Sequence, residues 1–268
     1  MSVNNGLSDE TYNTLRAEFI DWIDTELTAM EQCIDEGTSD TFVSSEQDST
    51  TVRLMRMAHN IKGSGSAFGF STVATISHRM EDFMSATSID LTDLQYRETL
   101  LKFIDEMRRV SELASEPNEA ESLAIVRALP NSTEYKLNQD SENADLNLAQ
   151  GKEVLIVSPS KTISAITRKV CESLKHRVTA SRNGTEALAL AMNMKPDIII
   201  VSTVLTGISG PDLTRALSNM HAIKDIKIIL ISNLEANHPD LADIPEKVDI
   251  INQSGDFPMA LFRLLQQF

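Results

Sequence analysis

The spacing of hydrophobic residues changes character along this chain. Up to about residue 130, apolar side chains recur at three- and four-residue steps, as on the buried face of an amphipathic helix. This spacing predicts four long helices and a shorter fifth one. The first follows a possible helix cap at Ser8 and ends near Gly37, and the others cover residues 50–68, 71–86, 91–115 and 117–129. Four long helices with short connections are typical of an up-and-down four-helix bundle.

From Gly151 onward, short β-rich runs alternate with helical stretches. The runs are EVLIVS, RVTAS, PDIIIVS, IKIILIS and VDIIN. Helical patterns lie between or after them, at residues 162–175, 184–194, 210–220, more weakly 238–243, and 256–267. This alternation, with apolar central runs, predicts a parallel sheet covered by helices on both faces. Among doubly wound folds of this size, the flavodoxin-like strand order fits best.

The segment between these two regions, residues 131–150, is polar and lacks a sustained apolar period. We interpret it as a linker, because such a composition offers little apolar surface to bury. The prediction is therefore a multidomain α and α/β protein. It has a helical bundle at residues 1–130, the linker, and a flavodoxin-like (βα)5 domain at residues 151–268.

The predicted helix 50–68 carries the strongest candidate chemistry. His59 and Lys62 are three residues apart, so they share one exposed patch of the helix. Gly63 and Gly65 follow, and the missing Cβ atoms would let a large partner approach the imidazole. The alternative is an ordinary surface histidine and lysine on a helix that frays at its glycines. The opposite, buried face of the helix is predicted to hold Met55, Ala58, Ile61 and Gly65.

A second histidine and a glutamate follow at fixed offsets. His78 and Glu81 lie 19 and 22 residues after His59, and the intervening FGFS is typical of a tight turn between two helices. The run AHNIKGSGSAFGF, with the histidine and glutamate at these offsets, resembles the histidine phosphotransfer (HPt) domain. It is most similar to the N-terminal HPt domain of CheA chemotaxis kinases, over roughly residues 8–115. The resemblance implies that His59 is a phosphoacceptor.

The residue chemistry agrees with that role. If Glu81 accepts a hydrogen bond from Nδ1–H of His59, the Nε2 atom is left free to attack phosphorus. Lys62 would supply positive charge for the transferring phosphoryl oxygens. His78 would either complete this network or be a satisfied core histidine. We expect no cofactor and no metal in this domain, since the partner kinase or receiver supplies nucleotide and Mg²⁺.

The second half resembles a response-regulator receiver domain through VLIVSPSKT, RNGTEALAL and PDIIIVSTVLTGISGPDL. It departs from that family where the family's chemistry is done. Ser158 and Pro159 occupy the places of the acidic pair that holds Mg²⁺, and Ser202 replaces the phosphoacceptor aspartate.

The other positions of the predicted receiver site also differ from the family pattern. Ser232 matches the expected hydroxyl after the fourth strand, but the expected lysine falls near Gln253 or Ser254. The nearest acid, Asp197, lies at the start of the third strand. We therefore predict a pseudo-receiver, used either to dock a kinase or another regulator, or only for packing or dimerising.

Charge and cysteine content narrow the classes of partner. Residues 1–150 hold 27 acidic and 11 basic side chains, a balance of −16, and residues 151–268 hold 12 and 13, a balance of +1, which together give the net charge of −15. This distribution argues against nucleic acid or an anionic membrane as the partner. Two isolated cysteines, Cys33 and Cys171, and the lack of an apolar span or signal-peptide pattern predict a cytoplasmic protein without a disulfide framework.

Two functional hypotheses follow. The first is a phosphorelay intermediate that takes a phosphoryl group on His59 from a kinase or receiver and passes it to a receiver aspartate. The alternative is a non-catalytic protein that sequesters a kinase or response regulator. We do not expect an autonomous enzyme, because the sequence has neither a glycine-rich ATP lid nor the nucleotide box of a CheA kinase.

Overall fold

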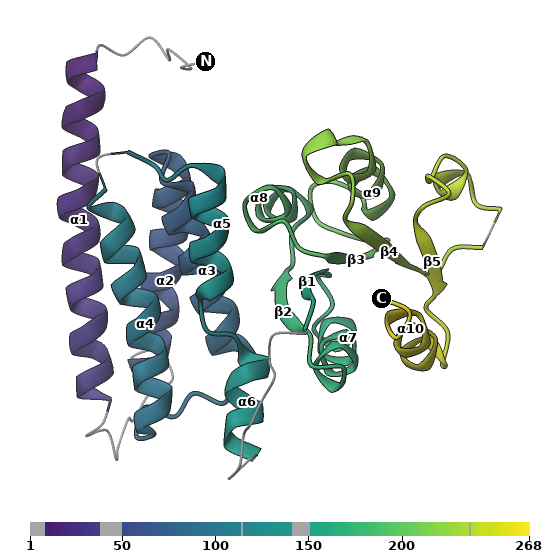
Figure 1. Ribbon diagram of the computed structural model, residues 1–268, viewed down its shortest axis with the longest axis horizontal. Helices are drawn as coiled ribbons and strands as arrows, with labels where there is room; N and C mark the ends of the chain where they lie inside the picture. The colour runs from purple at the N-terminus through teal and green to yellow at the C-terminus, as the bar shows by residue number, and fades with distance from the viewer. Residues whose placement is uncertain (1–8, 38–49, 114, 141–150, 236) are drawn as a thin grey trace. The chain divides into compact units, whose positions relative to one another are not determined.

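The computed structural model describes residues 9–37, 50–113, 115–140, 151–235 and 237–268 (Figure 1). By its internal contacts the chain divides into two compact units, Met1–Pro130 and Asn131–Phe268, and each is described by itself. The proposed helix cap Ser8 and the second half of the predicted linker, residues 141–150, lie outside the described residues.

The first unit is the predicted four-helix bundle. Its helices are α1 (Asp9–Glu36), α2 (Thr50–Ala67), α3 (Ser71–Ala86) and α4 (Leu94–Ser111). Each helix packs on the next, and α4 packs back on α1, which closes the bundle. Phe83 stacks on Tyr96 in its core, with ring centroids 5.4 Å apart. A fifth helix, α5 (Glu119–Ala128), packs on α3 and begins at Asn118, whose side chain accepts hydrogen bonds from the backbone N–H groups of Ala120 and Glu121.

Helix α4 is shorter than predicted at both ends, because local caps define it. The side chain of Asp93 accepts a hydrogen bond from the backbone N–H of Gln95 at 2.9 Å, which starts the helix there rather than at Leu91. Leu91 is nevertheless buried, so its apolar character reflects packing and not helix membership. Leu94, the first residue of α4, is 61% exposed although its side chain is apolar.

The second unit is built on a five-stranded parallel sheet. Its strands are β1 (Glu153–Val157), β2 (Arg177–Ser181), β3 (Ile198–Ser202), β4 (Lys227–Ser232) and β5 (Asp249–Asn252). Their order is β2-β1-β3-β4-β5, which confirms the flavodoxin-like prediction. The three central strands are almost entirely buried, as the apolar runs predicted. Because all strands are parallel, their carboxyl ends lie at one edge of the sheet.

Helices cover both faces of this sheet (Figure 1). They are α7 (Lys161–Ser173) and α10 (Phe257–Leu265), which pack on each other, and α8 (Gly184–Met194) and α9 (Gly210–Asn219), which do the same. Residues of β1 and β3 form one core cluster with Phe257 and Leu261 of α10. The weak helical pattern at 238–243 is only a 3-10 turn, η3 (Pro239–Leu241), and a second such turn, η2 (His221–Ile223), precedes β4.

The linker prediction is wrong for residues 131–140. Residues Ser132–Asp140 form helix α6, which packs on β2 and belongs to the second unit. Its contacts are largely polar: Thr133 Oγ1 donates to the carbonyl oxygen of His176 at 2.9 Å, and Lys136 Nζ pairs with Glu172 at 2.9 Å. Tyr135, on the same helix, is buried. A helix that depends on tertiary polar contacts carries little apolar periodicity, which is why the sequence pattern missed it.

Candidate functional site

The candidate site lies where α2 and α3 run side by side. His59, on α2, is exposed, with 66% of its side chain accessible. Its Nδ1 atom is 3.1 Å from Oε1 of Glu81, on α3, which is the predicted contact. A carboxylate can only accept, so this hydrogen bond requires the proton on Nδ1. The Nε2 lone pair is then the free nucleophile of the ring.

Lys62 lies on the same side of α2 but is less exposed than predicted. Its Nζ atom donates to Oε2 of Glu81 at 2.6 Å, and only 18% of its side chain is accessible. The ion pair holds the lysine side chain toward α3, which is consistent with its low accessibility. One carboxylate therefore contacts both His59 and Lys62, through its two oxygens.

The two glycines of the motif have different surroundings. An added Cβ atom at Gly63 would meet nothing within 4 Å, so the space beside this position is open, and its role in partner access stays a prediction. Gly65 is buried, and its added Cβ would lie 3.3 Å from the backbone N of Ala74 and from the carbonyl oxygen of Phe70. Its predicted role in partner access is therefore wrong: it allows α3 to approach α2 closely.

The remaining predicted residues of α2 and α3 differ in how deeply they are buried. His78 is buried, with 5% of its surface exposed, whereas the other three site residues reach the surface. Its place on the almost continuous buried stretch of α3 favours the core interpretation over a role in the network. On α2, Leu54 is buried where Met55 was expected, and Ala58, Ile61 and Gly65 are buried as expected. Gly69, at φ 79°, makes the predicted turn into α3.

Serine hydroxyls occupy the carboxyl edge of the sheet in the second unit. Ser158 follows β1, while Ser202 and Ser232 end β3 and β4, and all three are buried. Ser202 Oγ donates to Ser158 Oγ at 2.9 Å. Gln253 and Ser254, by contrast, have exposed side chains. In the described parts of the chain, no group of three or more histidine, cysteine, aspartate or glutamate residues is arranged to hold a metal ion.

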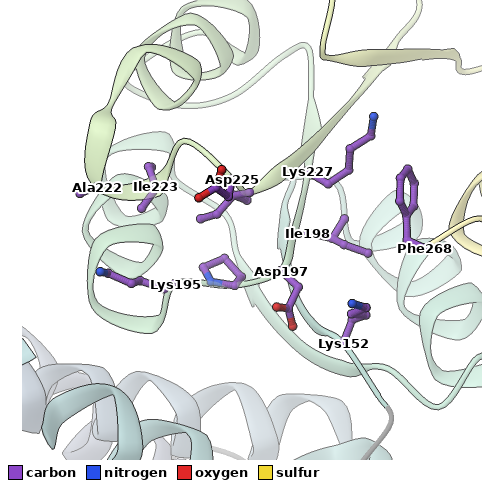
Figure 2. A pocket seen from close by; sticks show the side chains of 11 residues that line it. Lys152, Lys195, Asp197, Ile198, Ala222, Ile223, Asp225, Lys227 and Phe268 are labelled. Carbon is purple, nitrogen blue, oxygen red and sulfur yellow. The ribbon is translucent and has the colours of Figure 1, made fainter. Parts of the chain in front are cut away.

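A cavity of about 410 Å³ lies at the opposite, amino edge of the sheet (Figure 2). Lysines and aspartates both line it, and several of them already have partners. Asp197 Oδ2 accepts a hydrogen bond from the backbone N–H of Glu153 at 2.8 Å, and Lys227 pairs with Asp249 at 2.6 Å. Asp197 thus stabilises the start of two strands. It lies at the other end of β3 from Ser202, as the sequence indicated.

Comparison with known families agrees with both halves of this description. Residues 14–115 match the family model described as the Hpt domain, and residues 154–246 match that of the response regulator receiver domain. The bundle with its exposed histidine and the flavodoxin-like sheet are therefore an Hpt domain followed by a receiver domain. This architecture supports assignment of the chain to two-component phosphorelay systems.

Individual relatives are similar to about 30% of this chain. The polar-differentiation response regulator DivK of Brucella anthropi is 30% identical over 81 residues, which are 30% of this chain and 66% of DivK. Protein PilH of Pseudomonas aeruginosa is 30% identical over 79 residues, or 30% of this chain and 65% of PilH. Both matches span just under two thirds of the relative. Among solved structures, the chemotaxis response regulator CheY4 of Vibrio cholerae aligns with 44% of this chain and 98% of its own, at 19% identity and a TM-score of 0.41.

No helix within the described ranges is long and apolar enough to cross a lipid bilayer. Cys33 and Cys171 are both buried, and neither is part of a disulfide bond. Burial raises the pKa of the Cys171 thiol to about 12, which makes it a poor nucleophile.

Proposed function

We propose that this protein carries a phosphoryl group on His59 between a histidine kinase or receiver donor and a receiver aspartate. The observation that carries the proposal is the contact of one carboxylate, Glu81, with both His59 Nδ1 and Lys62 Nζ. An exposed imidazole is common on protein surfaces. Here the imidazole is held in one tautomer, a lysine lies beside it, and the next exposed glycine of the helix is open to a partner. Together these features form a nucleophilic site.

The transfer step balances with these groups. The Nε2 lone pair attacks phosphorus of an aspartyl phosphate, the N–P bond forms, and the P–O bond to the donor carboxylate breaks, which returns a free carboxylate. The ring keeps its Nδ1 proton and gains positive charge, and that charge faces Glu81. The return transfer to a receiver aspartate reverses each step. His59 therefore needs no separate general base.

Lys62 suits the stabilisation of the transferring group. Its ammonium is one helical turn from His59 and is already oriented by Glu81. Positive charge close to the phosphoryl oxygens stabilises the transition state of phosphoryl transfer. The partner supplies nucleotide and metal in this proposal, so the chain alone is not an enzyme, and the relay operates in the cytoplasm.

The proposal assigns no phosphoryl transfer to the receiver domain. Receivers need Mg²⁺ beside their phosphoacceptor, and the buried hydroxyls of Ser158, Ser202 and Ser232 do not fit that ion, because a hard divalent cation requires carboxylate oxygens. A serine also cannot form the acyl phosphate that an aspartate forms. We therefore propose a pseudo-receiver that docks a kinase or another regulator.

A phosphotransfer profile tests the proposal. Radiolabelled kinases and receivers from the same cell are mixed one at a time with this protein and with its His59→Gln variant. We expect at least one donor to label the native protein and none to label the variant. A protein that only sequesters its partner would bind both forms equally and take label in neither, which is the result that favours the alternative function.

A further inference from the structure

A buried serine connects the two helices of the phosphotransfer site. Ser77, on α3, is fully buried, and its Oγ atom donates to the carbonyl oxygen of Ala58, on α2, at 2.6 Å. Ala58 is the residue immediately before His59. Ser77 lies four residues before Glu81, which is one turn of the same helix. The hydrogen bond therefore joins the two helices at the level of the site.

The carbonyl of Ala58 has a second partner in the same site. In an α-helix the backbone N–H of residue i donates to the carbonyl of residue i−4, so this oxygen also receives the amide of Lys62. One acceptor is thus shared by the peptide that orients Lys62 and by the hydroxyl of Ser77. The backbone of α2 around His59 and Lys62 is tied directly to the helix that presents Glu81.

The close approach of the two helices at Gly65 has a different effect. Gly65 lets α3 approach closely near Ala74, but this is a van der Waals contact and has little directional preference. This contact sets the distance between the two helices. Its energy changes only slowly when α3 slides or rotates along α2. A hydrogen bond weakens steeply away from its optimal angle and distance. The Ser77 hydroxyl thus makes a buried directional contact in this interface, beside the more accessible contacts of Glu81 with His59 and Lys62.

We propose that Ser77 is a positioning residue that fixes the register of α3 against α2, so that Glu81 meets His59 and Lys62 together. The inference rests on the proposed phosphotransfer function. It acts through the 3.1 Å and 2.6 Å contacts of Glu81, which cannot both survive a small shift of α3. Because misplacement by about 1 Å can cost roughly a hundredfold in rate, a small loss of register should be measurable.

The test compares Ser77→Ala with Ser111→Ala in the full-length protein. Ser111 is also buried, but its hydroxyl donates within its own helix α4, to the carbonyl of Arg108, so its loss leaves the α2–α3 register untouched. Ser77→Ala should fold, because the Ala58 carbonyl keeps its helical partner. Two readouts are taken: the ¹⁵N chemical shifts of the His59 ring, which report which nitrogen carries the proton, and the rate of phosphorylation by a phosphorylated receiver.

We expect Ser77→Ala to lose the fixed Nδ1–H signature of His59 and to accept phosphate about tenfold more slowly, below the roughly hundredfold limit for gross misplacement. Ser111→Ala should leave both readouts as in the native protein. Ser77→Thr, which keeps a hydroxyl, should restore both. Unchanged ring shifts and an unchanged rate in a folded Ser77→Ala protein would overturn the proposal.

Two further outcomes remain decisive. If Ser77→Ala fails to fold by circular dichroism, Ser77→Cys replaces it, since a thiol fills similar space but donates weakly. Native ring shifts in that variant would contradict the positioning role. If no donor labels native His59, the proposed function fails, but the ring shifts need no donor and still decide whether Ser77 positions Glu81.

Discussion

Replacing Glu81 separates its two contributions to the site, the acceptor geometry and the negative charge. Glu81→Gln keeps the side chain's shape and one carbonyl oxygen that can accept from His59 Nδ1, but removes the charge that faces His59 and Lys62. Glu81→Ala removes the acceptor as well. The two variants therefore form a graded series, and the Gln variant is the sharper probe.

The expected magnitudes follow from the two contacts. Charge-assisted hydrogen bonds contribute roughly 1.5–3 kcal/mol and neutral ones roughly 0.5–1.5 kcal/mol, so the Gln variant loses about 1 kcal/mol at the His59 contact. If that loss falls on the transition state, in which the ring gains positive charge, transfer slows about fivefold to tenfold. Loss of the acceptor in Glu81→Ala slows it roughly tenfold to a hundredfold on the same scale.

Stability should change far less than rate. The Lys62–Glu81 pair is partly accessible, with 18% and 21% of the two side chains exposed, and such surface ion pairs contribute at most about 1 kcal/mol to the free energy of unfolding. The assay is single-turnover phosphorylation of His59 by a phosphorylated receiver, with urea denaturation of each variant. Glu98→Gln, the same change at an exposed position of α4, is the matched control. A Gln variant as fast as the native protein would refute the charge argument, and an Ala variant as fast as the native protein would refute the tautomer argument.

Three further predictions use other parts of the chain. Gly63→Ala should raise the free energy of unfolding by about 0.5–1 kcal/mol, because alanine has the higher helix propensity. It should also slow transfer from protein donors, because it adds a Cβ atom at an open docking position. Gly65→Ala should instead destabilise the bundle, because the added Cβ pushes α3 away from α2. Urea unfolding compared with donor-dependent rates checks both. Burial, followed by the nearby charge of Lys152, lowers the pKa of His176. The unfolded chain therefore binds more protons than the folded chain at low pH. The free energy of unfolding of residues 131–268 is thus highest above pH 6.5 and decreases as the pH drops below that value. Urea denaturation at pH 7.5 and 5.5 tests this, and equal midpoints would contradict it. A fragment of residues 1–130 should accept phosphate on His59 as fast as the full chain; loss of labelling in a fragment with native helicity would show that the receiver domain takes part in transfer.

The sequence predicted the elements whose patterns are long and regular. The first three long helices of the bundle agree closely in extent with α1 to α3 wherever both are described, because apolar spacing over many turns leaves little ambiguity. The sheet order followed from alternating strand and helix patterns, and the pairing of Glu81 with His59 followed from the offset across a tight turn.

The missed features depend on contacts between elements. Helix α6 exists because Thr133 and Lys136 find partners on the receiver fold, and their side chains carry no apolar pattern. The burial of Lys62 and the close approach at Gly65 depend on how near α3 lies to α2. The Ser77 hydrogen bond depends on the register of those helices, and a serine within a helix gives no local sign of a partner on its neighbour.

The most direct test is to locate the phosphoryl group after reaction with a competent donor. The native protein is labelled, then divided between acid and alkali, and the modified residue is identified by mass spectrometry under non-acidic conditions. The account predicts one modified residue, His59, with label that is lost in acid, retained in alkali and absent from His59→Gln. Label on Ser202, or label that persists in His59→Gln, would contradict it.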